Sequence, residues 1–211
     1  MKIEKVNNFW VPSNDVHIEE WRSGQAFTQN KCLNKFIKWC DKRNKRFNTV
    51  LDIGAWCGTW AKEMENYSKK IIAFEPDEIH FACLEKNCAT NCEPRQLAVG
   101  NNSKFISLTK DNFTQAKRIS GDGNIQMVTV DSLEMEDIDL IKIDVEGYEM
   151  EVLKGAKKTL ATTQYVMIEL NSNTGKYGSS NRECMIFLKE LGFKLLLEHW
   201  PDKVFHRVNP N

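Results

Sequence analysis

The stretch LIKIDVEGYEMEVLKGA, residues 140–156, decides the fold, because it is typical of a buried strand that turns into a helix. Between the strand and the helix lie Asp144 and Glu146, two positions apart and followed by a glycine. Alternation along a strand sends two such side chains to the same side. Neighbouring carboxylates repel each other unless a cation or a shared proton holds them. The pair is therefore a candidate functional site.

Strand-like and helix-like segments alternate along most of the remaining chain. Strands separated by helices of about a dozen residues are typical of βαβ units and a parallel sheet. We therefore predict an α/β fold. The expected strands span 48–54, 69–76, 94–100, 139–144, 164–170, 193–198 and 203–208, and the expected helices span 31–43, 59–70, 77–91, 149–161 and 180–191.

Two segments do not follow this alternation. In residues 101–130, KFISLTK and NIQMVTV resemble strands with the polar ISGDGN between them, which predicts a small antiparallel excursion or a flexible loop. Residues 1–30 hold two tryptophans without a clear period. They form either a packed N-terminal arm or a lid over a site.

Length and charge limit the class of protein. A chain of 211 residues is long enough for one domain, in which we expect an N-terminal arm and helix in residues 1–45 and an α/β core in residues 46–211. The 29 basic and 29 acidic residues disfavour nucleic acid or a membrane surface as the main partner. The composition does not indicate whether the protein is a monomer or an oligomer. No apolar run reaches the roughly 18 residues of a membrane span. The start MKIEKVNNFW lacks the apolar stretch of a signal peptide, so we expect a cytoplasmic protein that begins at or near Met1.

The cysteines do not form a zinc site in this sequence. None of the seven belongs to a C-x-x-C pair, and the four scattered histidines supply no second pair of ligands. Cys83, Cys88 and Cys92 fall in one predicted helix. We expect reduced thiols in an intracellular protein.

The first chemical motif is VLDIGAWCGTW, residues 50–60, in which a strand leads through two glycines into a helix. Glycines at such a turn let the backbone approach a ligand, and the helix start offers free N–H groups. Trp56 and Thr59 occupy the second and third glycine positions of a dinucleotide fingerprint, and no Gly-Lys-Ser/Thr follows as in a P-loop. The remaining pattern, D-x-G-x-x-x-G, is compatible with a nucleoside site or a plain tight turn.

Glu75 favours the nucleoside site. It ends the next strand, IIAFEP, 21 positions after Gly54. In a doubly wound sheet this position places a carboxylate beside the glycine turn, where it can accept hydrogen bonds from both ribose hydroxyls. A solvated acid at a strand end is the alternative. A ribose site without a phosphate cradle fits S-adenosylmethionine better than NAD or ATP.

Five blocks of the sequence together resemble the FkbM-type S-adenosylmethionine-dependent methyltransferases. The resemblance runs from about residue 48 to residue 170, and its most specific part is the stretch 140–156. It implies a class I methyltransferase fold, in which a mostly parallel, seven-stranded sheet carries helices on both faces and one antiparallel strand near the C-terminus. The blocks are VLDIGAWCG, IIAFEP, LAVG, VTVDSL and LIKIDVEGYEMEVLKGA.

The resemblance also implies an activity and a set of cofactor contacts. The family methylates hydroxyl oxygens of sugars, polyketides or other small molecules, so a small-molecule or carbohydrate hydroxyl acceptor is expected. The methionine end of the cofactor is expected near the first glycine turn, the ribose at Glu75 and the adenine near Ala98. Trp56 departs from the small polar residue usual in the family. The expected cofactor-binding residues are Asp52, Gly54, Ala55, Trp56, Gly58, Glu75, Pro76 and Ala98.

The acid pair of the opening stretch has a counterpart on the next strand. The segment VMIELNSN places Glu169 and Asn171 two positions apart, and the carboxyl ends of neighbouring parallel strands meet in one crevice. Asp144 and Glu146 are the predicted catalytic pair, and all four oxygen side chains are predicted ligands of Mg²⁺ or Ca²⁺. A metal or a carboxylate base promotes attack by an alcohol. The acids alternatively cap helices and bind backbone amides.

Two further side chains and two other functions remain open at this stage. Lys142 either moderates the repulsion between the acids or extends to the surface with its stem buried, and His199 is either a base or a structural residue. A nucleic-acid methyltransferase requires a basic face and a pocket for a flipped base. A cofactor-binding module without catalysis requires Glu75 but neither Asp144 nor Glu146.

Overall fold

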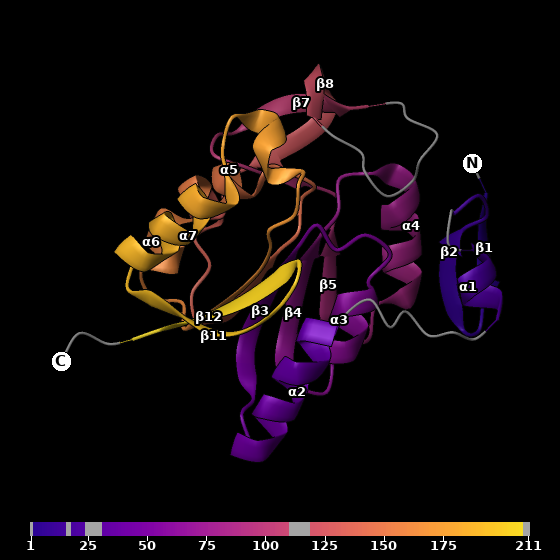
Figure 1. Cartoon of the computed structure of the whole chain (residues 1–211). Coiled ribbons are helices and arrows are strands. Elements are labelled where there is room, and N and C mark those ends of the chain that lie inside the picture. The colour runs from indigo at the N-terminus through magenta and orange to yellow at the C-terminus, as the bar shows by residue number, and fades with distance from the viewer. Residues whose placement is uncertain (1, 16–17, 24–30, 110–118, 209–211) are drawn as a thin grey trace.

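The computed structural model describes residues 2–15, 18–23, 31–109 and 119–208. Its centre is a seven-stranded sheet in the order β11-β12-β10-β9-β3-β4-β5 (Figure 1). Its ladders are parallel except those of β12, which runs antiparallel to both of its neighbours. This is the predicted α/β architecture of class I methyltransferases. The strands are β3 (Phe47–Ile53), β4 (Ser68–Phe74), β5 (Cys92–Arg95), β9 (Ile138–Ile143), β10 (Tyr165–Glu169), β11 (Phe193–His199) and β12 (Asp202–Arg207).

Helices cover both faces of the sheet, because the central strands are apolar on both sides. On β3, Val50 faces one helical layer and Leu51 faces the other, and neither side chain is exposed to solvent. One layer holds α2 (Lys31–Arg43), α3 (Thr59–Met64) and α4 (Glu78–Asn87), and the other holds α5 (Glu149–Gly155), α6 (Lys157–Leu160) and α7 (Asn181–Glu190). None of the helices in the described segments is long and apolar enough to cross a membrane.

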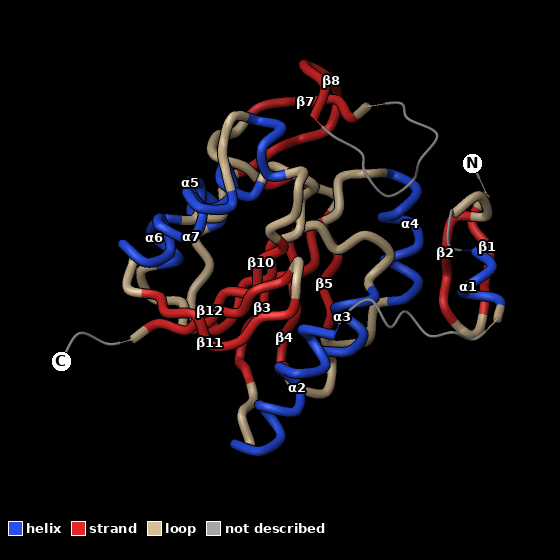
Figure 2. The backbone as a smooth tube through the Cα atoms, viewed as in Figure 1, coloured by secondary structure: helices blue, strands red, loops and turns tan. Residues whose placement is uncertain are grey.

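Two smaller units lie outside the central sheet (Figure 2). A three-stranded sheet in the order β6-β8-β7 follows β5 in the chain. An N-terminal hairpin of β1 and β2 lies beside α4. The remaining elements are β1 (Ile3–Val6), β2 (Phe9–Pro12), α1 (Ile18–Arg22), β6 (Ala98–Val99), β7 (Lys104–Leu108), β8 (Ile119–Val128), η1 (Asp131–Leu133) and η2 (Thr174–Tyr177).

The predicted strand 94–100 was wrong in one respect, because the structure divides it between two sheets. The Leu97 N–H bonds to the Arg95 carbonyl (2.9 Å), and this tight turn takes the chain out of the central sheet. Ala98 and Val99 then pair with β8. The antiparallel excursion is confirmed, but ISGDGN is part of β8 itself rather than a connection. The predicted helix 149–161 is interrupted at Ala156.

The hairpin in residues 3–12 was missed, although its turn carries a sequence signal. Asn7 and Asn8 connect paired Val6 and Phe9, and both adopt positive φ (48° and 67°). A two-residue turn of this kind favours asparagine, because asparagine tolerates the left-handed region. The pair of asparagines between short apolar runs was therefore a hairpin signature.

The prediction of reduced thiols was wrong for one pair of cysteines. The structure joins Cys88 and Cys92 in a disulfide, with their Cα atoms 5.4 Å apart. Helix α4 ends before the predicted 91, and Cys88 adopts an extended conformation, so the chain turns back toward β5 and the two residues meet. The other cysteines are free and buried.

Candidate active site

A cavity of about 570 Å³ lies at the carboxyl ends of β3, β4, β9 and β10. Ligand sites of open α/β sheets lie at this edge, where the strand order reverses. Two of the predicted cofactor residues, Asp52 and Gly58, do not line the cavity. The predicted cofactor residues that line it are Gly54, Ala55, Trp56, Glu75, Pro76 and Ala98.

The glycine turn after β3 requires glycine at Gly54. Its φ is +79°, and a Cβ at this position would stand 1.8 Å from the carbonyl oxygen of Asp144. The N–H groups of Gly54 and Ala55 both bond to the Phe74 carbonyl (3.0 and 2.9 Å), which holds the turn against β4. The backbone at Gly54 therefore packs directly against the backbone that follows β9, and Gly54 also lines the cavity.

Glu75 faces the cavity from the end of β4 and is 7% exposed. One of its carboxylate oxygens accepts from the Trp56 N–H and the other from the Asp77 N–H, each at 2.9 Å. A carboxylate oxygen has two lone pairs, so each retains capacity for a ligand hydroxyl. Glu75 thus holds the glycine turn and presents an acceptor pair to the cavity.

Asp52 lies beneath this turn and is fully buried. The Lys142 ammonium lies 3.0 Å from Asp52, donates to the Gly54 carbonyl (2.6 Å) and lies 3.6 Å from Asp144. Burial opposes the charge of Lys142, but the carboxylates of Asp52 and Asp144 outweigh it and raise the pKa of Lys142. The lysine therefore moderates the acids and connects β9 to the glycine turn. Its side chain does not extend to the surface.

The structure brings Asp144, Glu146 and Glu169 together, each offering a carboxylate oxygen within 4.8 Å of the others. The route differs from strand alternation, because β9 ends at Ile143 and Glu146 has a φ of +56°. A left-handed turn aims its side chain back toward the cluster. We name these three carboxylates the acid cluster. Among the described residues, the acid cluster is the group of three or more Asp, Glu, His or Cys side chains that lie close enough together to hold a metal ion.

Asn171 supports the acid cluster rather than offering its own oxygen. Its Nδ2 donates to Glu169 (2.7 Å), and its Oδ1 accepts from the Asn173 N–H (2.6 Å). The Asn173 side chain in turn donates to Glu146 (2.6 Å). The loop after β10 therefore orients two of the three carboxylates.

Two acids of the cluster, Glu146 and Glu169, hold protons more tightly than isolated carboxyls. Burial, followed by the charge of Asp144, raises the pKa of Glu146 to about 7 and that of Glu169 to about 10. Burial and Asp144 also raise the pKa of Asp202, across the cavity, to about 7. A carboxyl with a pKa near 7 can accept a proton at neutral pH, and a bound cation would lower these values.

The raised pKa of Glu146 predicts a stability that falls with rising pH in cation-free protein. The folded protein keeps this proton up to about pH 7, whereas the unfolded chain releases it near 4.5, so the folded state binds more protons in between. Denaturant unfolding in EDTA should lose roughly 1–3 kcal/mol between pH 5 and pH 7.5 through this group. Glu146→Gln should lose less unfolding free energy over this pH range. If it loses as much as the wild type, the pKa of Glu146 is not raised in the folded protein.

Several residues at the cavity were missed because they come from segments without a motif. His80 on α4 is 4% exposed, and in the described structure its Nε2 has no hydrogen-bond partner. Asp202 pairs with Glu169 across the β10–β12 ladder. His199, by contrast, does not line the cavity, and its Nδ1 lies 3.2 Å from the Trp200 carbonyl. The further lining residues without a predicted role include Asn7, Phe9, Trp21, Leu108, Ile119, Tyr148 and Tyr177.

Comparisons with known proteins place the chain in a family. The family model of the methyltransferase FkbM domain matches residues 44–195. Hexuronic acid methyltransferase AglP of Haloferax volcanii is 27% identical over 136 residues, which cover 59% of this chain and 56% of that protein. The chain thus aligns with little more than half the length of this curated relative.

Solved structures share the fold at low sequence identity. A methyltransferase FkbM from Methylobacillus flagellatus has a TM-score of 0.54 at 16% identity, over 76% of this chain and 43% of that one. Magnesium protoporphyrin IX methyltransferase from Synechocystis, solved with the bound cofactor, has a TM-score of 0.56 at 9% identity, over 92% and 93% of the two chains. Both are similar to this chain in the arrangement of the sheet and its helices.

Proposed function

Because the chain belongs to the FkbM methyltransferase family, we propose that this S-adenosylmethionine-dependent enzyme methylates a hydroxyl oxygen of a sugar, with a hexuronic acid as the first candidate. The observation that carries the proposal is one cavity lined both by Glu75 and by the acid cluster. We call its part at Glu75 the cofactor end and its part at the acid cluster the acceptor end. Lys142 joins them, because it donates to the Gly54 carbonyl and lies 3.6 Å from Asp144.

The cofactor end suits a nucleoside bound through its ribose. Glu75 offers buried acceptor oxygens to the two hydroxyls, and Ala98 and Leu97 offer an apolar wall to the adenine. Gly54 and Ala55 line the cavity beside Glu75 and would lie against the methionine part of the cofactor.

The acceptor end combines carboxylates with an apolar wall. Tyr148 and Tyr177 pack edge to face with ring centroids 5.0 Å apart, and Leu108 and Ile119 line the cavity on the same side. A pyranose ring has hydroxyls around its rim and apolar C–H groups on its faces. It can therefore place a face against Tyr148 and a hydroxyl against the acid cluster.

The transfer requires an oxygen nucleophile and an aligned methyl group. The acceptor hydroxyl gives its proton to a carboxylate, for which we propose Glu146, and its oxygen forms a bond to the methyl carbon. The bond from that carbon to sulfur breaks, and the electron pair remains on the neutral thioether of S-adenosylhomocysteine. The sulfonium is already an activated donor, so the cavity contributes mainly alignment and proton removal.

We also propose that the acid cluster binds Mg²⁺ or Ca²⁺ through Asp144, Glu146 and Glu169. Oxygen ligands without cysteine or histidine suit these hard cations. Without a cation, Glu169 keeps its proton at neutral pH and Glu146 is only partly ionised, so a cation would replace these protons. It would also offset the charge that a hexuronic acid brings to this end. The cation would polarise the acceptor hydroxyl and lower its pKa, so that Glu146 could take the proton although coordination lowers the pKa of Glu146 as well.

Transfer should accordingly depend on a divalent cation. Chelation with excess EDTA should reduce turnover by roughly 100-fold or more, the scale of losing the activation of the nucleophile, and Mg²⁺ or Ca²⁺ should restore it. The measurement is turnover on an identified acceptor, with metal content checked by elemental analysis. An unchanged rate in protein shown to be metal-free would assign the acids to direct hydrogen bonding instead.

The proposed acceptor class can be tested by a panel of substrates with one readout. Purified protein is incubated with S-adenosylmethionine and free hexuronic acids, neutral hexoses, phenols, amines or a short RNA, and S-adenosylhomocysteine is quantified. The expected result is product with hexuronic acids and less with neutral hexoses. Turnover with RNA or amines alone would overturn the proposal. Cofactor binding without turnover on any acceptor would favour the non-catalytic module.

A further inference from the structure

We infer that the N-terminal hairpin is part of the cofactor site and that Asn87 is the positioning residue that holds it there. The hairpin, with α1, lies outside the residues 44–195 matched by the family model. Phe9 and Trp21 from this segment nevertheless line the same cavity as Glu75. The inference concerns binding of the cofactor and goes beyond the proposed acceptor.

Asn87, the last residue of α4, joins the hairpin to the glycine turn. Its Oδ1 accepts from the Trp10 N–H, and its Nδ2 donates to the Trp10 carbonyl and to the Cys57 carbonyl, all at 2.8 Å. The residue is 9% exposed, so these bonds are shielded from water. Both free backbone groups of Trp10 are thus satisfied by one side chain, whose third bond reaches the glycine turn.

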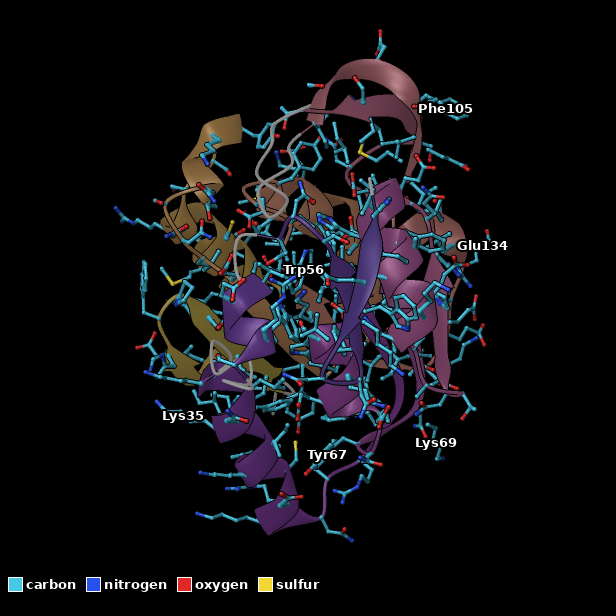
Figure 3. The ribbon with its side chains drawn as sticks, turned by 90° about the vertical axis from the view of Figure 1, so that its right-hand side faces the viewer. Lys35, Trp56, Tyr67, Lys69, Phe105 and Glu134 are labelled. Carbon is cyan, nitrogen blue, oxygen red and sulfur yellow. A yellow bond between two sulfur atoms is a disulfide. The ribbon has the colours of Figure 1, made fainter. Side chains whose placement is uncertain are left out.

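An aromatic wall extends from the hairpin to the same turn. Phe9 stacks on Trp21 (centroids 5.2 Å apart, 5° between planes), and Trp21 lies 6.0 Å from Trp56 at 35°. The Trp56 ring then meets His80 at 6.2 Å, nearly edge-on. Figure 3, which views the molecule from the hairpin side, places Trp56 near the centre of the molecule. All four side chains line the cavity.

The wall explains why Trp56 stands where the family usually has a small polar residue. Trp56 adopts a φ of +49°, a conformation that a bulky residue rarely takes, and its ring packs against the hairpin cluster. A small residue at this position would leave Trp21 without that contact. The hairpin and Trp56 therefore act as one unit, which forms a wall of the cavity that Glu75 also lines.

This arrangement has a consequence for the cofactor. Aromatic rings suit both an adenine ring and a sulfonium cation, and a wall of them excludes water from the ribose contacts at Glu75. The hairpin lies beside α4 rather than on the central sheet (Figures 1 and 2). Its release should therefore expose the cofactor while the sheet remains folded.

The test is Asn87→Ala, with Asn91→Ala as the matched control. Asn91 also bonds two backbone carbonyls, those of Glu65 and Ser68 (both 2.9 Å), but it contacts neither the hairpin nor the cavity. Asn87→Ala should raise the Kd for S-adenosylmethionine roughly tenfold, mainly through a faster dissociation rate, because buried hydrogen bonds that hold the wall are lost. Asn91→Ala should leave the Kd within about twofold.

Hydrogen exchange distinguishes positioning from a general loss of stability. In Asn87→Ala, amides of residues 3–12 should exchange faster while those of β3 and β9 keep their wild-type protection. In the wild type, saturating cofactor should slow exchange in the hairpin, because coupling between binding and docking is reciprocal. Trp21→Ala, which removes the middle ring of the wall, should weaken binding to a similar extent.

Each other outcome overturns a part of the inference. A hairpin that exchanges freely in Asn87→Ala with an unchanged Kd would show that it does not belong to the cofactor site. A hairpin that stays protected in this variant would show that Asn87 does not hold it. If Asn87→Ala speeds exchange throughout the central sheet, and Trp21→Ala leaves the Kd unchanged, Asn87 has only a structural role. Binding needs no acceptor, so these outcomes are independent of the proposed sugar substrate.

Discussion

Replacing Glu75 by alanine should weaken binding of S-adenosylmethionine by about 2–4 kcal/mol, because two charge-assisted hydrogen bonds to the ribose are lost. This corresponds to a Kd roughly 30- to 1,000-fold higher. The same carboxylate accepts the N–H groups of Trp56 and Asp77, so its loss also loosens the glycine turn. Titration calorimetry on the variant measures the effect directly.

A matched control is available on the neighbouring strand. Glu93 on β5 is paired with Lys70 and Arg95 and does not line the cavity. Glu93→Ala removes a carboxylate from the adjacent strand, opposite Ile72 of β4, and it should leave the Kd within a few-fold of wild type. An equal affinity of Glu75→Ala and wild-type protein would refute the assignment of the ribose to Glu75.

The second large effect is expected at the acid cluster. Asp144→Asn and Glu146→Gln should each lower transfer by roughly 100- to 10,000-fold, the range for loss of a general base or of the group it orients. Cofactor binding should stay within a few-fold, because Glu75 and the glycine turn are unchanged. The measurement is single-turnover methyl transfer at saturating cofactor, together with the Kd of each variant.

Glu151→Gln is the control for this pair of substitutions. Glu151 lies on α5, pairs with Lys154 and does not line the cavity. Its neutralisation should leave turnover near the wild-type value. Full turnover in Asp144→Asn or Glu146→Gln would show that the substituted residue is neither the base nor a required cation ligand.

Much of the fold could be predicted because its signals are local. Apolar runs of strand length alternate with segments of helical period, and the apolar spacing over residues 31–43 predicts α2 with the bounds that the structure has. The antiparallel β12 came from the family resemblance, since nothing in its own residues specifies the direction of a strand. The N-terminal hairpin was missed because two four-residue strands are too short to show a period.

The site was predictable where strand ends converge and unpredictable where a contact depends on a turn. The two-residue spacing correctly predicts that Asp144 and Glu146 lie together. Strand alternation is not the cause, however, because Glu146 follows the strand and adopts a left-handed conformation. The sequence predicts the Asn171 side-chain oxygen as a metal ligand, but in the structure this oxygen accepts a hydrogen bond from the Asn173 N–H in the following loop. The ion pair of Lys142 with Asp52 joins residues on neighbouring strands, which only the sheet register reveals.

The proposed site is tested most directly by a crystal structure of the protein with S-adenosylhomocysteine and a hexuronic acid. We expect both ribose hydroxyls within hydrogen-bond distance of Glu75, at roughly 2.5–3.0 Å. We also expect one acceptor hydroxyl between the thioether sulfur and the acid cluster. A ribose bound away from Glu75, or an acceptor whose hydroxyls all point away from Asp144, Glu146 and Glu169, would refute the proposed site.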